Sequence, residues 1–404
     1  MTSTTTDPAP FPRPGGFPVV GVVGGGQLAR MMQPAAVALG VRLQVLTEAP
    51  GSSAAQVITP APVGAADDLD ALRAFAAGCD VVTFDHEHVP TPHLRELQAA
   101  GASVRPGPDA LVHAQDKTVM RERLTALGVP CPRWRRVAGE AELTAFAEEV
   151  GWPVVLKTPR GGYDGKGVLV VDGPDGGWRA TAAGWWERGE LLAEEHVPFT
   201  RELAVLVARS PSGQAAAWPV VQTVQAGGVC REVVAPAPDL DADLAAHATA
   251  TALRIAEGLG VTGVLAVEVF EVERGGRSEV LVNELAMRPH NSGHWSIDGA
   301  VTGQFEQHLR AVLDLPLGDP RPRAPWTVMV NVLGRPDPEP RHADLFRSHL
   351  HVMAHDPGVK VHLYGKEYRP GRKLGHVTAY GDDLVAVLDR ARHAAAFIAG
   401  EIDE

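Results

Sequence analysis

The sequence contains few cysteines and no long apolar run. Its three cysteines, Cys79, Cys131 and Cys230, are too widely separated to suggest a disulfide framework or a zinc site, so a reducing compartment is expected. No apolar run is long enough to span a bilayer, and the first fifteen residues lack the basic start and apolar stretch of a signal peptide. These absences predict a cytoplasmic protein with no membrane partner and a disordered leader over residues 1–16.

Positive charge is also in short supply. The formal net charge is −12, with 21% of the residues charged and 45% hydrophobic. An acidic chain of this kind argues against general nucleic-acid binding, which depends on neutralising phosphates. Small phosphorylated ligands are still compatible with it, because a local basic pocket can form on an acidic protein. A length of 404 residues favours two or three globular domains.

A glycine-rich turn lies near the N-terminus, in GVVGGGQLARMM at residues 21–32. The valines before it predict a buried strand over residues 19–23, and the sequence after it predicts a helix over 28–39. Further strand patterns at 41–48 and 80–89 alternate with helices. This alternation indicates a parallel sheet with right-handed crossovers.

Gly24, Gly26 and Ala29 in this turn match the spacing of a dinucleotide-binding unit, in which a helix N-terminus holds an anion. Glu48 lies close to the position of the acidic residue that binds a ribose in such units. An NAD-dependent dehydrogenase is therefore one hypothesis. The rest of the chain contains a denser phosphate-binding pattern that competes with it.

The stretch WPVVLKTPRGGYDGKGVLVV at residues 152–171 has the form strand, glycine-rich loop, strand. It is not a P-loop, because no helix follows the loop. The glycines around Lys166 suit a flap that closes over phosphates, and Lys157 at the end of the first strand can reach a phosphate. The alternative is a surface hairpin without a ligand.

The stretch EEHVPFTRE at residues 194–202 is expected to form a strand that leaves its sheet at Pro198. A sheet edge of that type can present main-chain groups to an adenine. Glu202 could then accept hydrogen bonds from ribose hydroxyls. The alternative is a charged strand end at the surface.

An acidic residue, Glu268, interrupts the apolar strand GVLAVEVF, and a later strand contains Asn283 and Glu284. The turn at residues 274–276 predicts that the two strands form a β-hairpin. A buried carboxylate needs a cation or a partner, and a cluster of oxygen ligands suits magnesium held together with ATP phosphates. The alternative is an ion pair with an arginine or a lysine.

In this order, the lysine, the glycine loop, the segment 194–202 and the carboxylate cluster resemble the ATP-grasp superfamily. More narrowly, GGGQLARM, TFDHEHV, GGYDGKG, RPHNSGHW and YGKEYRPGRKLGHVT are similar to motifs of the 5-(carboxyamino)imidazole ribonucleotide synthase family of purine biosynthesis. The resemblance implies a homodimer with an α/β and α+β ATP-grasp fold. The implied parts are a Rossmann-like N-terminal domain at 17–108, an ATP-grasp domain at 109–322 and a small C-terminal domain at 323–404.

The resemblance also implies a reaction. Enzymes of this family join bicarbonate to the exocyclic amine of 5-aminoimidazole ribonucleotide (AIR), while ATP is cleaved to ADP and phosphate by way of carboxyphosphate. The chain is then expected to be an ATP-dependent, ADP-forming carboxylating ligase. Its partners are expected to be AIR, bicarbonate and ATP, and its cofactors ATP and Mg²⁺, with two ions.

The roles of single residues are implied only by the match of the motifs. The residues implied at the ATP site are Arg105, Lys157, Gly162, Tyr163, Asp164, Gly165, Lys166, Gly167, Val168, Glu194, Glu195, His196, Val197, Glu202, Gln225, Asn283 and Glu284. The residues implied at the reacting centre are Tyr163, Asp164, Arg288, His290 and Asn291. Those implied to contact AIR are Gln27, Leu28, Glu87 and, at its phosphate, Lys366, Arg372 and Lys373. The implied magnesium ligands are Glu268 and Glu284.

Three places depart from the family pattern. The run at 85–88 has histidines where the family usually has an aromatic residue and asparagine, Met287 replaces a proline, and Gln225 replaces a histidine that commonly contacts ATP. Two other hypotheses therefore stay open: an ATP-grasp ligase acting on a different amine or carboxylate, and a non-catalytic nucleotide sensor. The retained pair of carboxylates argues against the sensor, which does not need a magnesium site.

Overall fold

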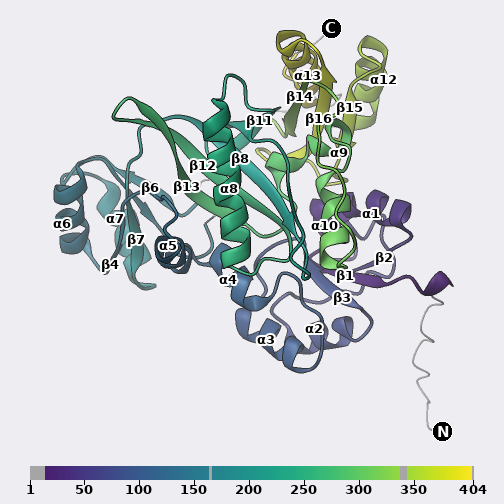
Figure 1. Ribbon diagram of the computed structural model, residues 1–404, viewed down its shortest axis with the longest axis horizontal. Helices are drawn as coiled ribbons and strands as arrows, with labels where there is room; N and C mark the ends of the chain where they lie inside the picture. Colours follow the sequence, from purple (N-terminus) through teal and green to yellow (C-terminus); the bar gives the residue numbers. More distant parts are fainter. Residues whose placement is uncertain (1–13, 163–165, 337–343, 403–404) are drawn as a thin grey trace. The chain divides into compact units, whose positions relative to one another are not determined.

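The computed structural model describes residues 14–162, 166–336 and 344–402 (Figure 1). The chain divides into two compact units, an N-terminal unit that ends at Arg105 and a C-terminal unit that begins at Pro106. In the parts that the structure describes, no helix has the length and apolar character that a membrane span requires.

The N-terminal unit contains a parallel sheet in the order β2-β1-β3. Its strands are β1 (Val19–Val23), β2 (Arg42–Leu46) and β3 (Val81–Phe84). Its helices are η1 (Pro14–Gly16), α1 (Gln27–Leu39), α2 (Leu69–Ala76) and α3 (Thr91–Ala99). Every residue of β1 is buried, as expected for the central strand of a parallel sheet that its helices cover. The predicted alternation of strands and helices is confirmed.

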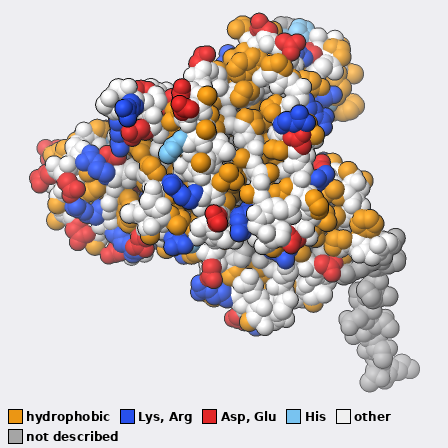
Figure 2. Space-filling view, in the orientation of Figure 1, with side chains coloured by type: hydrophobic (Ala, Val, Ile, Leu, Met, Phe, Trp, Pro, Cys, Tyr) orange, Lys and Arg blue, Asp and Glu red, His pale blue; other side chains and the backbone are white. Residues whose placement is uncertain are grey.

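A small antiparallel sheet begins the C-terminal unit, in the order β4-β7-β5-β6. Its strands are β4 (Trp134–Val137), β5 (Val154–Lys157), β6 (Val168–Val171) and β7 (Leu191–Glu195). The helices of this part of the chain are α4 (Pro108–Gln115), α5 (Lys117–Ala126), α6 (Glu140–Val150) and α7 (Trp178–Trp186). Phe146 and Trp178 bring α6 and α7 into one core with this sheet. On the outside, acidic and basic side chains are intermingled (Figure 2).

A larger sheet follows, in the order β13-β12-β8-β10-β11-β14-β16-β15, with β9 paired to β8. Its strands are β8 (Phe199–Arg209), β9 (Ala215–Ala217), β10 (Val221–Ala226), β11 (Val229–Ala235), β12 (Gly263–Arg274), β13 (Arg277–Ala286), β14 (Trp326–Leu333), β15 (Lys360–Leu363) and β16 (Lys373–Gly381). The helices of this part are α8 (Ala242–Gly258), η2 (Asn291–Gly293), α9 (Ser296–Gly299), α10 (Gln304–Val312), α12 (Leu345–His355) and α13 (Leu384–Ala399).

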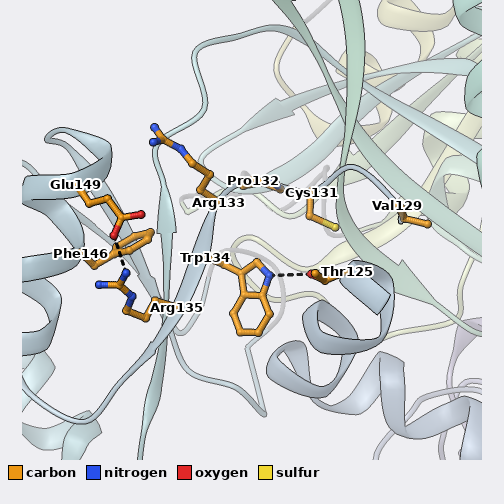
Figure 3. A pocket seen from close by; sticks show the side chains of 9 residues that line it. All are labelled: Thr125, Val129, Cys131, Pro132, Arg133, Trp134, Arg135, Phe146 and Glu149. Atoms are coloured by element: carbon orange, nitrogen blue, oxygen red, sulfur yellow. Dashed lines mark hydrogen bonds and ion pairs between the residues drawn. The ribbon is translucent and has the colours of Figure 1, made fainter. Parts of the chain in front are cut away.

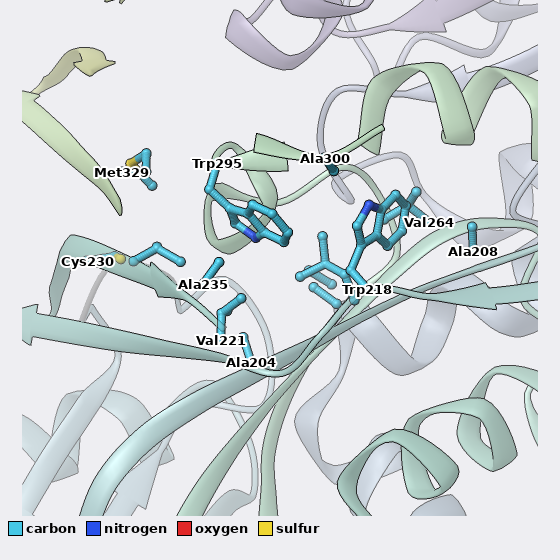
Figure 4. Close-up of a cluster of buried hydrophobic side chains, with 14 of the residues drawn as sticks. Ala204, Ala208, Trp218, Val221, Cys230, Ala235, Val264, Trp295, Ala300 and Met329 are labelled. Carbon is cyan, nitrogen blue, oxygen red and sulfur yellow. The ribbon is translucent and has the colours of Figure 1, made fainter. Parts of the chain in front are cut away.

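The core of this larger sheet is built on two buried tryptophans. Trp218 and Trp295 pack among small side chains such as Ala204, Ala208 and Val264 (Figure 4). Trp295 belongs to the RPHNSGHW motif, so the burial of its ring fixes that motif against the sheet. The small side chains on β8 and β12 leave room for the two indoles.

Strand β14 joins the C-terminal strands to the rest of the larger sheet. Its residues pair with β11 on one side and with β16 on the other. The residues that follow the proline-rich stretch at 319–325 therefore continue the sheet of the ATP-grasp part. The domain boundaries at 108 and 322 stay predictions.

The expectation for residues 194–202 is correct about the break at Pro198 but wrong about a single strand at the edge of a sheet. They form the end of β7 and the start of β8, which lie in two different sheets. β7 is also an interior strand, between β4 and β5, and all five of its residues are buried. The sequence did not reveal this, because Glu194 and Glu195 look like surface residues although both are paired with cations of the protein.

Candidate active site

Two carboxylates face each other on the β12–β13 hairpin. Glu268 on β12 is paired in register with Glu284 on β13, and a bulge follows Glu268. The hairpin turns at Gly275 and Gly276, whose φ values of 60° and 77° favour glycine. The predicted hairpin and the predicted apposition of the two carboxylates are confirmed.

The surroundings of Glu268 make its negative charge unfavourable. Removal from water raises the pKa of Glu268 to about 8, with further contributions from the carboxylates of Glu284 and Glu202. The positive charges of Lys373 and Arg288 act in the opposite direction without cancelling this effect. Burial also raises the pKa of Glu202. With all three carboxylates ionised, the cluster would carry more negative charge than the nearby protein cations balance, so Glu268 is mostly protonated near pH 7 unless a cation binds.

The donor set suits a hard cation only in part. Glu268, Glu284 and Asn283 supply oxygen atoms, which is the chemistry that Mg²⁺ prefers. However, Glu284 Oε1 accepts a hydrogen bond of 3.0 Å from Lys117 Nζ, so the alternative of an ion pair with a lysine is realised at Glu284. Among the residues that the structure describes, no group of three or more His, Cys, Asp or Glu side chains is arranged to hold a metal by itself. Bound phosphates would have to complete the coordination.

Lys157 belongs to a buried network that joins both sheets of the C-terminal unit. Its Nζ lies 2.6 Å from Glu194 Oε2 and donates to Asn283 Oδ1 at 3.3 Å. Arg121, which is completely buried, donates from Nε to Glu194 Oε1 at 2.5 Å and from a terminal nitrogen to the Asn283 carbonyl at 2.7 Å. Burial alone would raise the pKa of Glu194, but the charges of Arg121 and Lys157 lower it to about 2.

The side chains of the predicted adenine segment are therefore committed to the protein. Glu195 is held by Arg133 at 2.8 Å and by Arg274 at 2.9 Å. His196 is exposed, while Val197 is buried and packs in an apolar group with Val272 and Leu281 and the half-buried Phe270. This segment can offer a nucleotide its main-chain groups and an apolar neighbour, but not its glutamate side chains.

The glycine-rich loop is described only at its two ends. Tyr163, Asp164 and Gly165 lie outside the described residues. Gly167 has a φ of 68°, and its carbonyl accepts a hydrogen bond of 2.9 Å from the main-chain N–H of Thr158. Lys117 Nζ also donates to the Gly162 carbonyl at 3.2 Å, so one lysine connects the loop to Glu284. At the C-terminal end of the loop lie Lys166 and Val168, of which Val168 is 39% exposed.

A cavity of about 650 Å³ borders this loop. Thr158, Gly161 and Gly167 line it, together with Arg160 and Trp185. A second cavity, of about 380 Å³, lies between α5 and β4 and is lined by residues outside the predicted sites, such as Cys131 and Trp134 (Figure 3). There the Trp134 indole donates to Thr125 Oγ1 at 3.1 Å and Arg135 pairs with Glu149 at 2.6 Å.

The loop that follows β13 is clamped by Gln304 at the start of α10. Gln304 Oε1 accepts from the main-chain N–H of His290 at 2.8 Å, and its Nε2 donates to the His290 carbonyl at 2.9 Å. The His290 Nε2 lies 3.5 Å from Glu268 Oε1. Burial, with the charges of Arg288 and Lys373, lowers the pKa of His290 to about 3, so its ring is neutral at pH 7. The structure thus brings His290 and the carboxylate cluster together.

Asn291 makes a reciprocal amide pair with Asn331 on β14. Each side chain donates to the other, at 2.9 and 2.8 Å. The predicted phosphate-binding cations follow on the neighbouring β15–β16 hairpin. Arg372 donates to the Glu367 carbonyl at 3.1 Å, and Lys366 lies over the Tyr364 ring at 5.9 Å. The charge of Lys373, the first residue of β16, acts on both Glu268 and His290.

Gln225 lies on β10 just after a bulge in its pairing with β11, opposite Cys230. Sequence reasoning missed four residues that hold the site: Lys117, Arg121, Gln304 and Asn331. They lie on α5, α10 and β14, and, apart from Lys117, nothing in their local patterns distinguishes them from surface residues. The local signal at Lys117 is its position directly after Asp116, which caps α5, because this places a basic side chain in the first turn of that helix.

The N-terminal unit contains the remaining candidates. Leu28 is 5% exposed, so its side chain is unsuited to contact a polar ligand. Asp85 Oδ1 accepts from the main-chain N–H of Ala29 at 2.7 Å, and a Cβ on Gly26 would come within 2.0 Å of Asp85 Oδ2. The glycine turn therefore already holds a carboxylate of its own protein at the N-terminus of α1. Gln27 is the first residue of α1, and Glu87 lies after β3. Both belong to this unit, and Arg105 is its last residue.

Glu48, the residue that suggested a dinucleotide, lies with its Oε1 3.2 Å from His86 Nε2. The His86 hydrogen bond is the main factor that lowers the pKa of Glu48. Glu48, just after β2, is therefore paired with a histidine that follows β3 rather than left for a ribose.

Comparison with known proteins identifies the family. Three family models match in sequence order: a ribonucleotide synthetase preATP-grasp domain at residues 18–115, an ATP-grasp domain at 122–305 and a phosphoribosylaminoimidazole carboxylase C-terminal domain at 327–390. An N5-carboxyaminoimidazole ribonucleotide synthase of Mycobacterium tuberculosis (strain H37Rv) is 54% identical over 382 residues, which cover 94% of this chain and 87% of the relative. The chain belongs to the N5-carboxyaminoimidazole ribonucleotide synthase family.

Solved structures of this family have the same fold. The synthetase from Thermus thermophilus matches with a TM-score of 0.82 and 37% identity, covering 95% of this chain and 99% of that one. The synthase from Aspergillus clavatus in complex with ADP and 5-aminoimidazole ribonucleotide matches with a TM-score of 0.85 and 30% identity, covering 96% and 99%.

The predicted family and ATP-grasp fold are therefore confirmed, and the chain is an ATP-dependent ligase rather than a dehydrogenase. The roles of the individual residues stay predictions.

Proposed function

We propose that the protein uses ATP and bicarbonate to carboxylate the exocyclic amine of AIR, forming 5-(carboxyamino)imidazole ribonucleotide in de novo purine biosynthesis. The observation that carries this proposal is the convergence of Glu268, Glu284 and His290, with Lys157 attached through Asn283, in a chain of this family. Carboxylates, a neutral imidazole and a lysine are the groups that phosphoryl transfer followed by proton transfer requires.

ATP is proposed to bind along the seam between the two sheets of the C-terminal unit. The main chain of residues 194–197 and the apolar group around Phe270 would take the adenine. Lys157, held in place by Glu194 and Asn283, would present its charge to the phosphates. Lys117 would add a second charge, because it already joins Glu284 to the glycine-rich loop.

Glu268 and Glu284 are proposed to hold two Mg²⁺ ions, with Asn283 beside them. Magnesium bound there would neutralise charge on the ATP phosphates. The excess negative charge of the cluster supports a cation of this kind. Lys117 would then share Glu284 with the metal.

The chemistry is proposed to run in two steps. A bicarbonate oxygen attacks the γ-phosphorus, and the bond to ADP breaks to give carboxyphosphate. The amine nitrogen of AIR then attacks the carboxyl carbon, phosphate leaves, and the amine loses a proton. Arg288 would stabilise the developing carboxylate. His290 is the candidate for proton transfer, for which the negative charge of the bound substrates would have to raise its pKa from about 3. Asn291, fixed by Asn331, would orient the bicarbonate-derived group.

AIR is proposed to bind with its phosphate on Lys366, Arg372 and Lys373. The domain boundaries at 108 and 322, a homodimer and a cytoplasmic location complete the proposal. Light scattering of the purified protein tests the dimer, because a monomer mass at working concentrations would contradict it.

The central test is ADP formation with ATP, Mg²⁺ and bicarbonate, in the presence and absence of AIR. We expect AIR to stimulate ADP formation and Glu284→Gln to reduce the rate by about 10³-fold or more, since transition-state charge would be left without stabilisation. Glu279→Gln, an exposed position on the same strand, is the matched control and should retain the wild-type rate. A wild-type rate that is independent of AIR would refute the proposal.

A further inference from the structure

Three histidine rings, two of them buried, form a column outside the predicted reacting groups. The His376 ring on β16 lies between those of His294 and His362, with ring centroids 5.0 and 4.6 Å apart and interplanar angles of 28° and 19°. His294 and His376 are 1% and 0% exposed. Stacked rings at these spacings make favourable contacts that depend on orientation.

Each ring in the column has a polar contact that fixes its orientation. Gln304 Nε2 lies 2.7 Å from His294 Nδ1, the Tyr364 hydroxyl lies 2.8 Å from His376 Nδ1, and Asp298 Oδ2 lies 2.7 Å from His362 Nε2. Because an amide nitrogen only donates, His294 Nδ1 is the acceptor and the proton of the neutral ring lies on Nε2. His376 Nε2 is buried without a hydrogen-bond partner.

The column is part of a row that crosses three strands of the larger sheet. Asn331 on β14, His376 on β16 and His362 on β15 are direct neighbours in the strand register. Asn331 makes the reciprocal pair with Asn291, and His376 stacks on His294. The sheet therefore holds the 288–296 loop at two points that are three residues apart in sequence.

The same row is continuous with the segments that carry the proposed phosphate-binding cations. His376 follows Lys373 by three residues on β16, and its partner Tyr364 precedes Lys366 by two. At the other end, Gln304 contacts both the His294 ring and the main chain of His290. One set of contacts thus connects the reacting loop to the β15–β16 hairpin.

We propose that the row Asn331, His376 and His362 is a positioning device that sets the loop bearing Arg288 and His290 at a fixed distance from the cations that hold the AIR phosphate. His376 is the central positioning residue, because its ring stacks on His294 of the loop and its Nδ1 bonds the hydroxyl of Tyr364, whose ring also meets that of His294 edge-on at 6.3 Å. The proposal rests on the proposed function for the identity of the substrate, but not for the positioning of the loop.

Two variants separate the contacts of His376. His376→Asn keeps a polar atom for Tyr364 but removes the stacked ring, whereas Tyr364→Phe keeps the stack and removes the hydroxyl. We expect His376→Asn to raise the KM for AIR by about 10-fold or more, with the KM for ATP within about 2-fold of wild type, because small displacements of positioned groups have large kinetic costs. Tyr364→Phe should give a smaller rise in the same parameter.

His351→Asn is the matched control. His351 also stacks on other rings, with centroids 5.7 Å from His393 and 3.7 Å from Phe397, but these lie on α13. Its KM for AIR should equal that of wild type. An equal rise of both KM values in His376→Asn, or no rise in either, would overturn the proposal.

Hydrogen exchange decides the positioning role without any activity. In His376→Asn the amides of residues 288–296 should exchange at least about 10-fold faster than in wild type, while those of the β12–β13 hairpin should not change. Unchanged protection of the loop would overturn the positioning role. If wild type failed to respond to AIR but the loop lost protection in the variant, the proposed function would fail and the positioning role would stand.

Discussion

The small and the large sheet of the C-terminal unit each place a glutamate within an apolar strand, and the two glutamates differ in almost every respect. Glu194 on β7 is 3% exposed at its side chain and lies between Arg121 and Lys157. Glu268 on β12 is 29% exposed and has the carboxylates of Glu284 and Glu202 around it. The pKa of Glu194 is lowered to about 2 and that of Glu268 is raised to about 8.

The difference separates a structural carboxylate from one that awaits a ligand. The charge of Glu194 is balanced inside the protein, so a bound molecule could not improve its environment through that side chain. The charge of the Glu268 cluster exceeds what nearby cations balance, so a ligand that brings positive charge would be favoured. The position of a carboxylate in an apolar strand therefore says little by itself, and its neighbours decide its role.

Removing Arg121 should produce the largest effect. Arg121→Met leaves Glu194 buried with Lys157 alone and takes a donor from the Asn283 carbonyl. We expect the free energy of unfolding to fall by roughly 3–5 kcal/mol, as is usual when one partner of a buried ion pair is removed. Urea unfolding at neutral pH measures this.

The matched control is Arg136→Met, because Arg136 pairs with Glu122 and Glu190 at the surface. A surface pair contributes less than about 1 kcal/mol. If Arg121→Met and Arg136→Met lowered the free energy of unfolding equally, the ion pair between Arg121 and Glu194 would not have the structural role assigned to it.

The pH dependence of stability should be the next largest effect. The folded-state pKa of Glu194 lies below its ordinary value, so its contribution is present above about pH 4.5 and is lost as the pH falls towards 2. The stability difference between wild type and Glu194→Gln should therefore shrink over this interval. Urea unfolding from pH 6 to pH 3 checks the sign, and a difference that grew on acidification would contradict it.

Changing Glu268 should have the smallest effect on folding. Glu268→Gln removes one of three clustered carboxylates and leaves no buried cation unpaired, so the free energy of unfolding without Mg²⁺ should change by less than about 1 kcal/mol. The measurement is urea unfolding in the presence of a chelator. A loss as large as that of Arg121→Met would remove the distinction between the two sheets.

The sequence predicted those parts of the fold that depend on neighbouring residues. The β12–β13 hairpin follows from two strand patterns around Gly275 and Gly276. The short turn by itself would oppose Glu268 to Asn283, and the bulge after Glu268, which the sequence did not reveal, brings Glu284 opposite it instead. The parallel sheet of the N-terminal unit was predicted from its alternating strands and helices. The segment 194–202 was misjudged because its pattern does not show that two sheets share it.

The contacts that orient the site could not be predicted in the same way. Arg121 lies on a helix whose next two residues, Glu122 and Arg123, are charged and exposed, and only the tertiary fold places it between Glu194 and Asn283. Gln304 and His376 reach the His290 loop from elements 14 and more than 80 residues away in sequence. Polar residues in such places look like surface residues until the packing of distant elements is known.

The pairing of β14 with β11 also bears on how the protein can be divided experimentally. A fragment that stopped at residue 322 would leave the main-chain groups of residues 232–235 without their partners on β14. Exposed strand edges of this kind recruit strands from other molecules and promote aggregation. If such a fragment were insoluble, the cause would be the missing strand β14 rather than an unstable nucleotide-binding fold. A fragment meant to be soluble should therefore extend beyond β16.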